Sequence, residues 1–449
     1  MLATVELPLL INGRQVAPLS NQTLDVVNPA TEQVEVRVAD AGPGDVDLAV
    51  RAACGSFETT WRRITPTGRG NLLYRLAELV KLHAAEIALL DTKDMGKPYR
   101  HALEHDAAGA VEVLQFYAGL CDKIRGSQIP AGVDKHIHVV REPVGVVACI
   151  LPWNFPFASA VQKLAPALAC GNTIVLKPAE QSPRSALRLA EPCLDAGIFP
   201  GVVNTVTGRG ETTGSALAGH PGVGKISFTG STEVGRKIVH AAAEHVSKFT
   251  LELGGKSSFI VFPDAPLEAA VAASVATSCY NSGQVCTSGS RLVLHRDIHD
   301  QFLDALIRQM KELKVGDPMQ SDTKLGPLCS AEQLQRVRGY VELGSGSYST
   351  LSGGWRSESL VKGYYQDPVV FDHVDPASTL AQEEIFGPVL SVIDFETEEQ
   401  ALQIANQTRY GLATSIWTRD IGRAHRMASL VDSGFVWINT SNDWTPAVP

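Results

Sequence analysis

The feature that most constrains the fold of this chain is a regular alternation of short apolar segments and helical segments, beginning at about residue 144. VGVVACIL, NTIVLK and KISFTG are apolar runs of strand length, and segments such as SAVQKLAPALACG lie between them with helical periodicity. Strands that are apolar on both faces and alternate with helices form parallel sheets covered on both sides. A second series of this kind runs from SFIVFP to FVWIN. The sequence therefore predicts an α/β protein.

Two segments before this alternation have other patterns. From about Thr23 to Lys135 the periodicity is mostly helical, and ALEHDAAGAVEVLQFYAGL is its clearest amphipathic stretch. HIHVVREP then alternates apolar and charged residues from His136 to Pro143, which predicts a strand with one face in water. We expect an exposed hairpin here that is able to pair with another subunit.

Composition excludes several classes of partner. The 39 basic and 48 acidic side chains give a formal charge of −9, so no overall positive field attracts a nucleic acid. No run approaches the roughly 18 apolar residues of a membrane span, so we expect no membrane partner. The eight cysteines form no CxxC pair, and the N-terminus lacks a signal-peptide pattern. We therefore expect a cytoplasmic protein without a disulfide framework.

Two histidine pairs have the HxxxH spacing, His101 with His105 and His295 with His299. Neither belongs to an HExxH motif, and neither has an obvious third ligand nearby, so ordinary surface histidines are the simpler interpretation. We predict no metal site.

Polar residues follow two predicted strands at the sheet edge where open α/β proteins bind ligands. FTGSTEVG places Gly230 and Gly235 at a strand-to-helix turn whose N–H groups favour a phosphate, although an ordinary tight turn is the alternative. KPAE places Lys177 and Glu180 after NTIVLK. A carboxylate there can accept the hydroxyls of an adenine ribose and repels a 2′-phosphate, which favours NAD over NADP. A solvated ion pair in a loop is the alternative.

Three further residues have the chemistry of covalent catalysis. Cys286 lies among Gly, Ser and Thr residues in NSGQVCTSGSR, so it is either a nucleophile or an inert surface thiol. Glu252 ends a strand before a glycine pair in LELGG, where apolar surroundings would weaken its acidity and suit a general base; a salt-bridged glutamate is the alternative. Asn154 is flanked by prolines in PWNFP, so it is either a fixed oxyanion donor or part of a plain turn.

The chain resembles the NAD(P)-dependent aldehyde dehydrogenase superfamily, in particular its acid-forming members. The segments that carry this resemblance are, in order, PWNFP, KPAE, FTGSTEVG, LELGGKS, GQVCTSGSR, EEIFGPV and GFVWIN. The similarity extends from about Asn12 to Asn439. It implies an aldehyde dehydrogenase-like fold in which residues 1–120 and 143–254 form a Rossmann-type NAD-binding domain. Residues 121–142 would form a small β oligomerisation hairpin and residues 255–449 an α/β catalytic domain. The resemblance also implies a homodimer or homotetramer.

The resemblance assigns a role to each site residue. Cys286 would attack the aldehyde to give a thiohemiacetal whose oxyanion is held by the Asn154 amide and the Cys286 N–H. After hydride transfer to the nicotinamide, Glu252 would activate the water that hydrolyses the thioester to a carboxylic acid, and Lys163 would support the site. Members that pass the acyl group to coenzyme A generally lack this glutamate. The implied cofactor contacts are Trp153, Lys177, Glu180, Gly230, Ser231, Gly235, Glu384 and Phe386.

The resemblance leaves the aldehyde open. By family position the substrate tunnel is lined by Phe155, Gln162, Tyr280, Val285, Thr287 and Trp444, which suits an aromatic aldehyde or an amine held over a ring. Asp443 beside Trp444 slightly favours a cationic aminoaldehyde, and a solvent-facing loop aspartate is the alternative. Family members continue past GFVWIN into a glycine-rich motif and a last strand, whereas this chain ends at Pro449. We therefore expect an unpaired edge on the hairpin and a tunnel open on one side.

Two other functions are compatible with the same residues. A cysteine esterase would use Cys286 and Glu252 without a cofactor, and dependence of turnover on NAD distinguishes it. A non-catalytic protein could also retain the fold, and reactivity of Cys286 toward a thiol reagent distinguishes that alternative.

Overall fold

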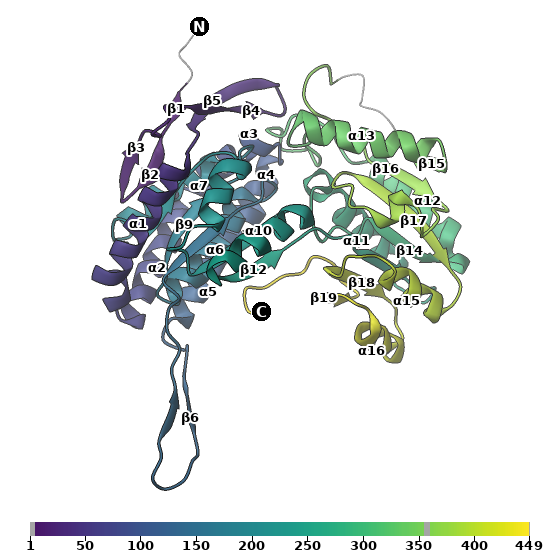
Figure 1. The fold of residues 1–449 in the computed structure, drawn as a ribbon. Helices are drawn as coiled ribbons and strands as arrows, with labels where there is room; N and C mark the ends of the chain where they lie inside the picture. Colours follow the sequence, from purple (N-terminus) through teal and green to yellow (C-terminus); the bar gives the residue numbers. More distant parts are fainter. Residues whose placement is uncertain (1–4, 354–359, 449) are drawn as a thin grey trace.

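The computed structural model describes residues 5–353 and 360–448, and its two largest sheets have seven strands each (Figure 1). The first sheet has the order β12-β11-β8-β9-β10-β2-β3. Its parallel strands are β8 (Val146–Ile150), β9 (Thr173–Lys177), β10 (Val203–Thr205), β11 (Lys225–Thr229) and β12 (Lys248–Glu252). The strands β2 (Leu9–Ile11) and β3 (Arg14–Val16) extend it in antiparallel fashion.

Strand order reverses between β8 and β11. From β8 the chain adds β9 and β10 on one side, whereas β11 and β12 lie on the other side. Two apolar clusters cover the two faces of this sheet. One includes α2 (Pro66–Leu82), α5 (Ala108–Leu120) and α6 (Pro156–Ala169), and the other includes α1 (Pro43–Thr59), α9 (Ser215–Ala218) and α10 (Thr232–His245). In open sheets, ligands bind beyond the carboxyl ends of the strands where the order reverses.

The second sheet has the order β15-β16-β17-β14-β13-β18-β19. Its members are β13 (Ser258–Val261), β14 (Arg291–His295), β15 (Ser349–Ser352), β16 (Val369–Asp372), β17 (Val389–Phe395), β18 (Ala413–Trp417) and β19 (Phe435–Ile438), and only β15 pairs in antiparallel fashion. The helices α11 (Leu267–Cys279) and α12 (His299–Lys311) cover one face. The helices α13 (Ala331–Ser345), α15 (Glu398–Asn406) and α16 (Ile421–Leu430) cover the other. Full burial of both faces explains why these strands are continuous apolar runs.

A two-stranded hairpin of β6 (Ser127–Ile129) and β7 (Ile137–Val139) projects from the body of the molecule (Figure 1). Its strand residues are exposed on both faces, whereas the sequence pattern predicted one buried face. The remaining helices are α3 (Ala84–Met95), α4 (Tyr99–His101), α7 (Arg184–Arg188), α8 (Ala190–Asp195) and α14 (Thr379–Gln382). No helix of the described residues has the length and hydropathy to span a bilayer.

Two expectations for the first part of the chain need correction. The segment that was expected to be helical from Thr23 begins with two antiparallel strands, β4 (Thr23–Asn28) and β5 (Gln33–Ala39), and the short β1 (Glu6–Leu7) pairs with β5. Their valines alternate with polar residues around a turn, which is a strand pattern. The long amphipathic helix is also interrupted, because residues Ala102–Ala107 form a π-helical segment before α5.

Candidate active site

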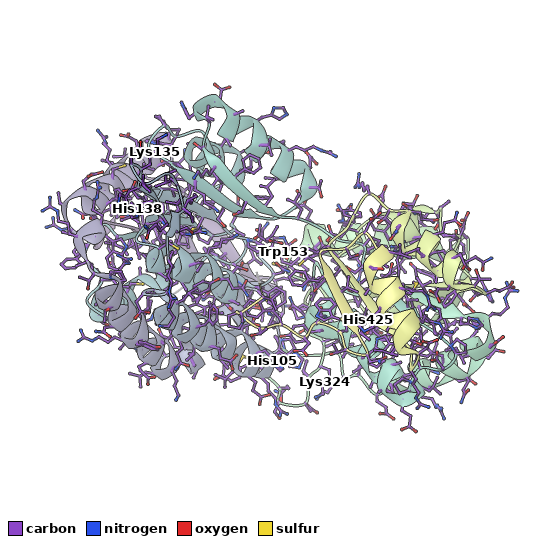
Figure 2. All side chains as sticks on the ribbon, turned by 90° about the horizontal axis from the view of Figure 1, so that it is seen from below. His105, Lys135, His138, Trp153, Lys324 and His425 are labelled. Atoms are coloured by element: carbon purple, nitrogen blue, oxygen red, sulfur yellow. The ribbon has the colours of Figure 1, made fainter. Side chains whose placement is uncertain are left out.

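Four adjacent parallel strands of the first sheet bring the predicted residues to one edge. Trp153 and Asn154 follow β8, Lys177 ends β9, and Glu180 lies just beyond it. Gly230 and Ser231 follow β11, and Glu252 ends β12. These strands are neighbours in the order β12-β11-β8-β9, so their carboxyl ends form one edge that includes the reversal of strand order. In Figure 2, Trp153 lies between the two halves of the molecule.

The second sheet contributes site residues from the amino ends of its strands, whereas the first sheet contributes them from carboxyl ends. Cys286 precedes β14, and Glu384 and Phe386 precede β17, which pairs with β14. The predicted site therefore lies between the carboxyl edge of one sheet and the amino edge of the other.

Asn154 connects these two edges. Its Nδ2 donates to the backbone oxygen of Gln284 at 2.9 Å, and its own backbone oxygen accepts from Nδ2 of Asn281 at 3.0 Å. The Asn154 side chain is buried, so this bond holds its amide in one orientation. The acceptor, Gln284, lies two residues before Cys286 in the chain. A primary amide has two hydrogens, and this bond uses one of them.

The loop that precedes Cys286 has an unusual backbone. Asn281, Ser282 and Gly283 all have positive φ angles of 50°, 56° and 73°. Asparagine and glycine tolerate this region, whereas serine adopts it at a cost of about 1 kcal/mol or more. Gln284 stabilises the loop, since its Nε2 donates to Asn281 O at 3.0 Å and its Oε1 accepts from Cys329 N at 2.9 Å. The sharp turn places Cys286 against Gly255, where a β-carbon would lie 2.4 Å from the Cys286 backbone oxygen.

The Cys286 thiol is surrounded by negative charge. Burial, together with the carboxylates of Glu384 and Glu252, raises the pKa of Cys286 to about 11, although backbone N–H groups of Thr287 and Cys286 act in the opposite direction. This differs from the positive surroundings that commonly activate cysteines. At neutral pH the sulfur is therefore protonated, and a base must take its proton before it can attack.

Glu252 is exposed at the end of β12, so the apolar surroundings expected from the sequence are wrong. The reason is tertiary: β12 is the edge strand of its sheet, so no further strand covers its outer side. Its carboxylate nevertheless acts on Cys286 and on Lys163. Nζ of Lys163, on α6, donates to Ser227 Oγ at 3.1 Å, and burial lowers the pKa of Lys163 to about 8 while Glu252 raises it.

The residues predicted for the adenine end of a dinucleotide also lie together. Nζ of Lys177 is buried and lies 3.4 Å from Oε2 of Glu180, whose other oxygen accepts from Gly210 N. Burial lowers the pKa of Lys177, and the charge of Glu180 opposes this. A buried ammonium and a half-exposed carboxylate at a sheet edge fit the hydroxyls of a ribose.

Helix α10 begins at the same sheet edge, after β11, which is separated from β9 by β8. Ser231 is its N-cap and accepts from Val234 N at 3.2 Å, and the exposed first turn presents its remaining N–H groups. Gly235 is buried, and a β-carbon there would lie 2.6 Å from Leu253 Cδ2. Gly235 thus allows α10 to pack closely on the chain that follows β12, which is the packing role of the third glycine in dinucleotide fingerprints.

The segment before β17 is held in place from two sides. Oε1 of Glu384 accepts from Gly255 N at 3.1 Å, and a β-carbon on Gly254 would lie 2.1 Å from its other oxygen. Phe386 has a positive φ of 60°, and its carbonyl accepts from Gln333 Nε2 at 2.7 Å. Its ring meets Trp153 edge to face with centroids 5.2 Å apart.

Aromatic residues predicted for the substrate tunnel form a wall near Asn154. Phe155 stacks on Tyr280 at 6.3 Å, and Nζ of Lys97 lies 3.6 Å from the Phe155 ring centroid while it forms a buried ion pair with Asp106. The other predicted lining residues differ in burial and contacts: Val285 is buried, Gln162 is exposed on α6, Trp444 is 45% exposed, and Thr287 donates to Asn442 Oδ1 at 2.7 Å.

The geometry is accompanied by extensive similarity to known proteins. A profile described as the aldehyde dehydrogenase family matches residues 16–449. The chain belongs to this family. The NADP/NAD-dependent aldehyde dehydrogenase PuuC of Escherichia coli (strain K12) is 42% identical over 448 residues, which are 99% of this chain and 90% of that protein. The aldehyde dehydrogenase of Leishmania tarentolae mitochondria is 43% identical over 98% of this chain and 88% of its own length. An NAD+ complex of aldehyde dehydrogenase from Bacillus cereus superposes with a TM-score of 0.97 at 42% identity, covering 99% of this chain and 90% of that chain.

These findings confirm the predicted family, the α/β fold and an aldehyde dehydrogenase as the class of enzyme. Sequence reasoning did not assign roles to Asn281 and Gln284, which hold Asn154 and the Cys286 loop, or to Gln333, which holds Phe386. The Asn-Ser-Gly run was a usable signal for positive φ. No local pattern indicated Gln333.

Proposed function

We propose that this chain oxidises an aldehyde to a carboxylic acid with NAD as hydride acceptor, through a covalent intermediate on Cys286. The observation that carries this proposal is the hydrogen bond from Asn154 to Gln284 O, because it fixes an amide donor beside the nucleophile loop. NAD accords with the NAD+ complex of the B. cereus relative and with the Lys177–Glu180 pair, whose carboxylate disfavours a 2′-phosphate.

The first step needs a base, because the Cys286 sulfur is a thiol at neutral pH. Glu252 is the exposed carboxylate that acts on this sulfur, so it takes the proton as the sulfur attacks the aldehyde carbon. The carbonyl oxygen becomes an alkoxide, which the second hydrogen of the Asn154 amide and the Cys286 N–H stabilise. As the alkoxide collapses, a hydride leaves this carbon and a thioester remains on Cys286. NAD would supply the hydride acceptor.

Hydrolysis of the thioester uses the same base. After the first proton has passed from Glu252 to solvent, Glu252 takes a proton from water and the hydroxide adds to the acyl carbon. The carbon–sulfur bond then breaks, and the proton on Glu252 returns to the sulfur, which gives the acid and the Cys286 thiol. Lys163 lies on the inner side of this edge and senses the Glu252 charge, so it is a positioning residue for that carboxylate.

The residues proposed to bind NAD fall into three groups, one for each part of the dinucleotide. Lys177 and Glu180 would hold the adenine ribose, and Gly230, Ser231 and the first turn of α10 would lie by the pyrophosphate. Trp153, Glu384 and Phe386 would position the nicotinamide end. Gly235 contributes through helix packing rather than through contact with phosphate.

For the substrate we propose an aldehyde with an aromatic or apolar chain. Phe155 already carries the Lys97 ammonium over its ring, so that ring attracts a second cation weakly. This argues against the cationic aminoaldehyde that Asp443 favoured in the sequence.

We extend the proposal to organisation and location. The NAD-binding domain comprises residues 1–120 and 143–254, and the catalytic domain comprises residues 255–449. The β6–β7 hairpin, with exposed Ile129, Ile137 and Val139, would serve a homodimer or homotetramer. The eight free cysteines suit a reducing cytoplasm.

The test is a burst experiment on the Glu252→Gln variant. With NAD and an aromatic aldehyde, this variant is expected to form NADH slowly, because Cys286 has lost the base that takes its proton, and to stop at about one equivalent. The acyl group should then remain on the Cys286 peptide in mass spectrometry. Glu233→Gln, an exposed glutamate on α10, is the matched control and should turn over normally. Cys286→Ala should form neither NADH nor adduct. Ester hydrolysis by the parent without NAD, together with no NADH from any aldehyde, would favour the esterase instead.

A further inference from the structure

A group of histidines and aspartates lies far from the residues used above. His299 begins α12, Asp372 ends β16, His373 follows it, and Asp394 lies in β17. We call these four residues the histidine–aspartate cluster. They lie at the carboxyl ends of the second sheet, whereas Cys286 and Glu384 precede strands β14 and β17 at its amino ends. The cluster is therefore on the opposite edge from the catalytic loop.

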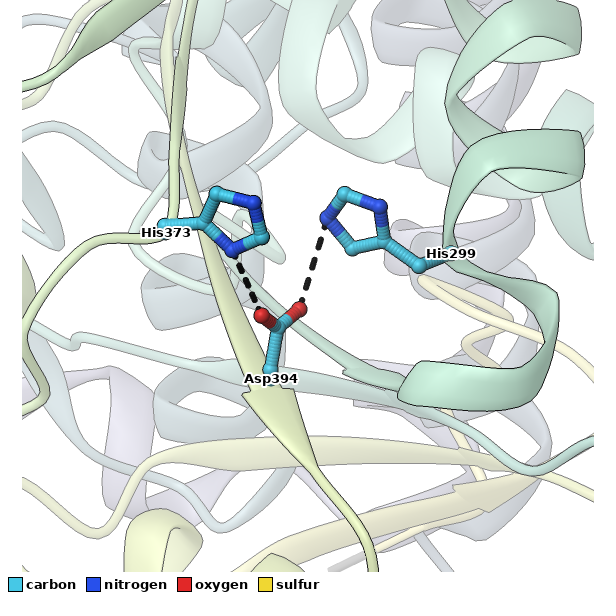
Figure 3. A group of neighbouring side chains, drawn as sticks. All are labelled: His299, His373 and Asp394. Carbon is cyan, nitrogen blue, oxygen red and sulfur yellow. Dashed lines mark hydrogen bonds and ion pairs between the residues drawn. The ribbon is translucent and has the colours of Figure 1, made fainter.

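The side chains converge on the Asp394 carboxylate (Figure 3). Nδ1 of His373 lies 2.6 Å from Oδ2 of Asp394, and Nε2 of His299 lies 3.4 Å from Oδ1. His299, His373 and Asp394 each offer one possible metal-ligating atom, and these three atoms lie within 4.8 Å of one another. Nε2 of His299 also lies 3.0 Å from Oδ1 of Asp372, which places a second carboxylate beside this group of three.

The hydrogen bonds around His299 leave one carboxylate oxygen of the cluster without a hydrogen-bond partner in the described part of the chain. Oδ1 of Asp300 lies 2.9 Å from Nδ1 of His299, so this nitrogen carries a proton and donates it. Nε2 of the same ring faces the oxygens of both Asp372 and Asp394, at 3.0 and 3.4 Å. Oδ1 of Asp394 is buried and has no hydrogen-bond partner among the described residues. A cation between these atoms would contact the His299 ring and the carboxylates of Asp372 and Asp394.

Charge and burial point the same way. Among the ion pairs of residues 5–353 and 360–448, those of Asp372 and Asp394 involve the two imidazoles and no lysine or arginine. His299 and Asp372 are each 9% exposed, whereas His373 is 64% exposed and gives access from solvent. A divalent ion would add the positive charge that no lysine or arginine of the described residues supplies to these two carboxylates.

We propose that the histidine–aspartate cluster binds a zinc ion through His299, His373 and Asp394, with the Asp372 carboxylate beside His299. Imidazole nitrogens and carboxylate oxygens both bind zinc, at about 2.0–2.2 Å from the metal, and in a tetrahedral site such ligand atoms lie about 3.4 Å from one another. The separations of 3.0 and 3.4 Å at His299 are close to this value, and small side-chain rotations adjust the others. Asp300 is then the carboxylate that orients the ligating histidine. The ion would fasten the start of α12 to β16 and β17, which is a structural role.

No local sequence pattern indicated this site. The ligands come from three elements, and the HxxxH pair of His295 and His299 contributes only one of them.

The test is calorimetric titration of zinc into the full chain after dialysis against a chelator, with Cys286→Ser in every sample to remove the reactive thiol. We expect one site in the parent, at least about tenfold weaker binding in His373→Ala, and loss of this site in Asp394→Asn. His373 is exposed, so its variant should remain folded. His425→Ala, an exposed histidine on α16, is the matched control and should bind as the parent does.

A second readout is the midpoint of thermal unfolding, which zinc should raise in the parent and in His425→Ala but not in Asp394→Asn. The proposal is wrong if the parent binds no zinc, or if His373→Ala and Asp394→Asn bind it with the parent's stoichiometry and affinity. Because NADH formation is not a readout, failure of this proposal leaves the proposed oxidation untouched.

Discussion

Replacing Asn154 by alanine separates the catalytic from the structural contribution of one buried amide. As an oxyanion donor Asn154 acts only when the alkoxide forms, so its loss should lower kcat by about 10²–10³, equivalent to roughly 3–4 kcal/mol. The structural cost is smaller. The variant loses the 2.9 Å bond to Gln284 O, but that oxygen keeps a second donor, Asn281 Nδ2, at 3.3 Å. The buried carbonyl is therefore not left unsatisfied, and we expect destabilisation of about 1 kcal/mol.

The assay is NADH formation at saturating NAD and aldehyde, paired with urea unfolding of the same samples. Asn172→Ala is the matched control, because Asn172 is equally buried but its Oδ1 accepts from the backbone nitrogens of Val144 and Gly145 at 2.7 and 3.2 Å. That variant should lose at least as much stability and keep kcat within about threefold. If Asn154→Ala kept the parent's kcat, or if Asn172→Ala lost as much activity, the oxyanion role of Asn154 would be refuted.

Three other perturbations have defined outcomes. Because the Glu384 charge raises the pKa of Cys286, Glu384→Gln should lower it and make alkylation by iodoacetamide at pH 8 about three- to tenfold faster; an unchanged rate would contradict the charge argument. Gly255→Ala places a β-carbon 2.4 Å from the Cys286 backbone oxygen and should cost about 1–3 kcal/mol in urea unfolding, whereas Gly109→Ala in α5, with no atom within 4 Å, should be neutral or stabilising. Burial raises the pKa of Asp91 to about 8, so the folded state holds this proton between about pH 4 and 8 while the unfolded chain releases it. Stability should therefore fall as pH rises through this range, and Asp91→Asn should flatten the dependence of the unfolding midpoint on pH; a parallel profile would show that Asp91 does not titrate there.

The proposed catalytic site of this protein lies between opposite ends of parallel strands in the two sheets. The first sheet supplies Asn154 and Glu252 after strands, as open α/β sheets usually do. The second sheet supplies Cys286 and Glu384 before strands, and only glycines allow the two loops to meet. A β-carbon on Gly283 would lie 2.3 Å from the Gly387 backbone, so the nucleophile loop and the segment carrying Phe386 need this contact.

Several features of this protein follow from local sequence. Strands such as β8 and β9 are buried on both faces, so every residue in them is apolar or paired, and their positions can be predicted from short windows. The motifs with Asn154, Glu252 and Cys286 were recognisable because each combines a reactive group with the glycines or prolines that fix its backbone.

Other features depend on contacts between distant segments, which no local pattern encodes. The exposure of Glu252 follows from the place of β12 at the edge of its sheet, and this place is set by how the strands pair. The hydrogen bond that orients Asn154 joins residues 130 positions apart. The histidine–aspartate cluster arises in the same way, because only the pairing of β14, β17 and β16 brings His299 to Asp372 and Asp394. Sequence determines which groups can react, and strand order decides which of them meet.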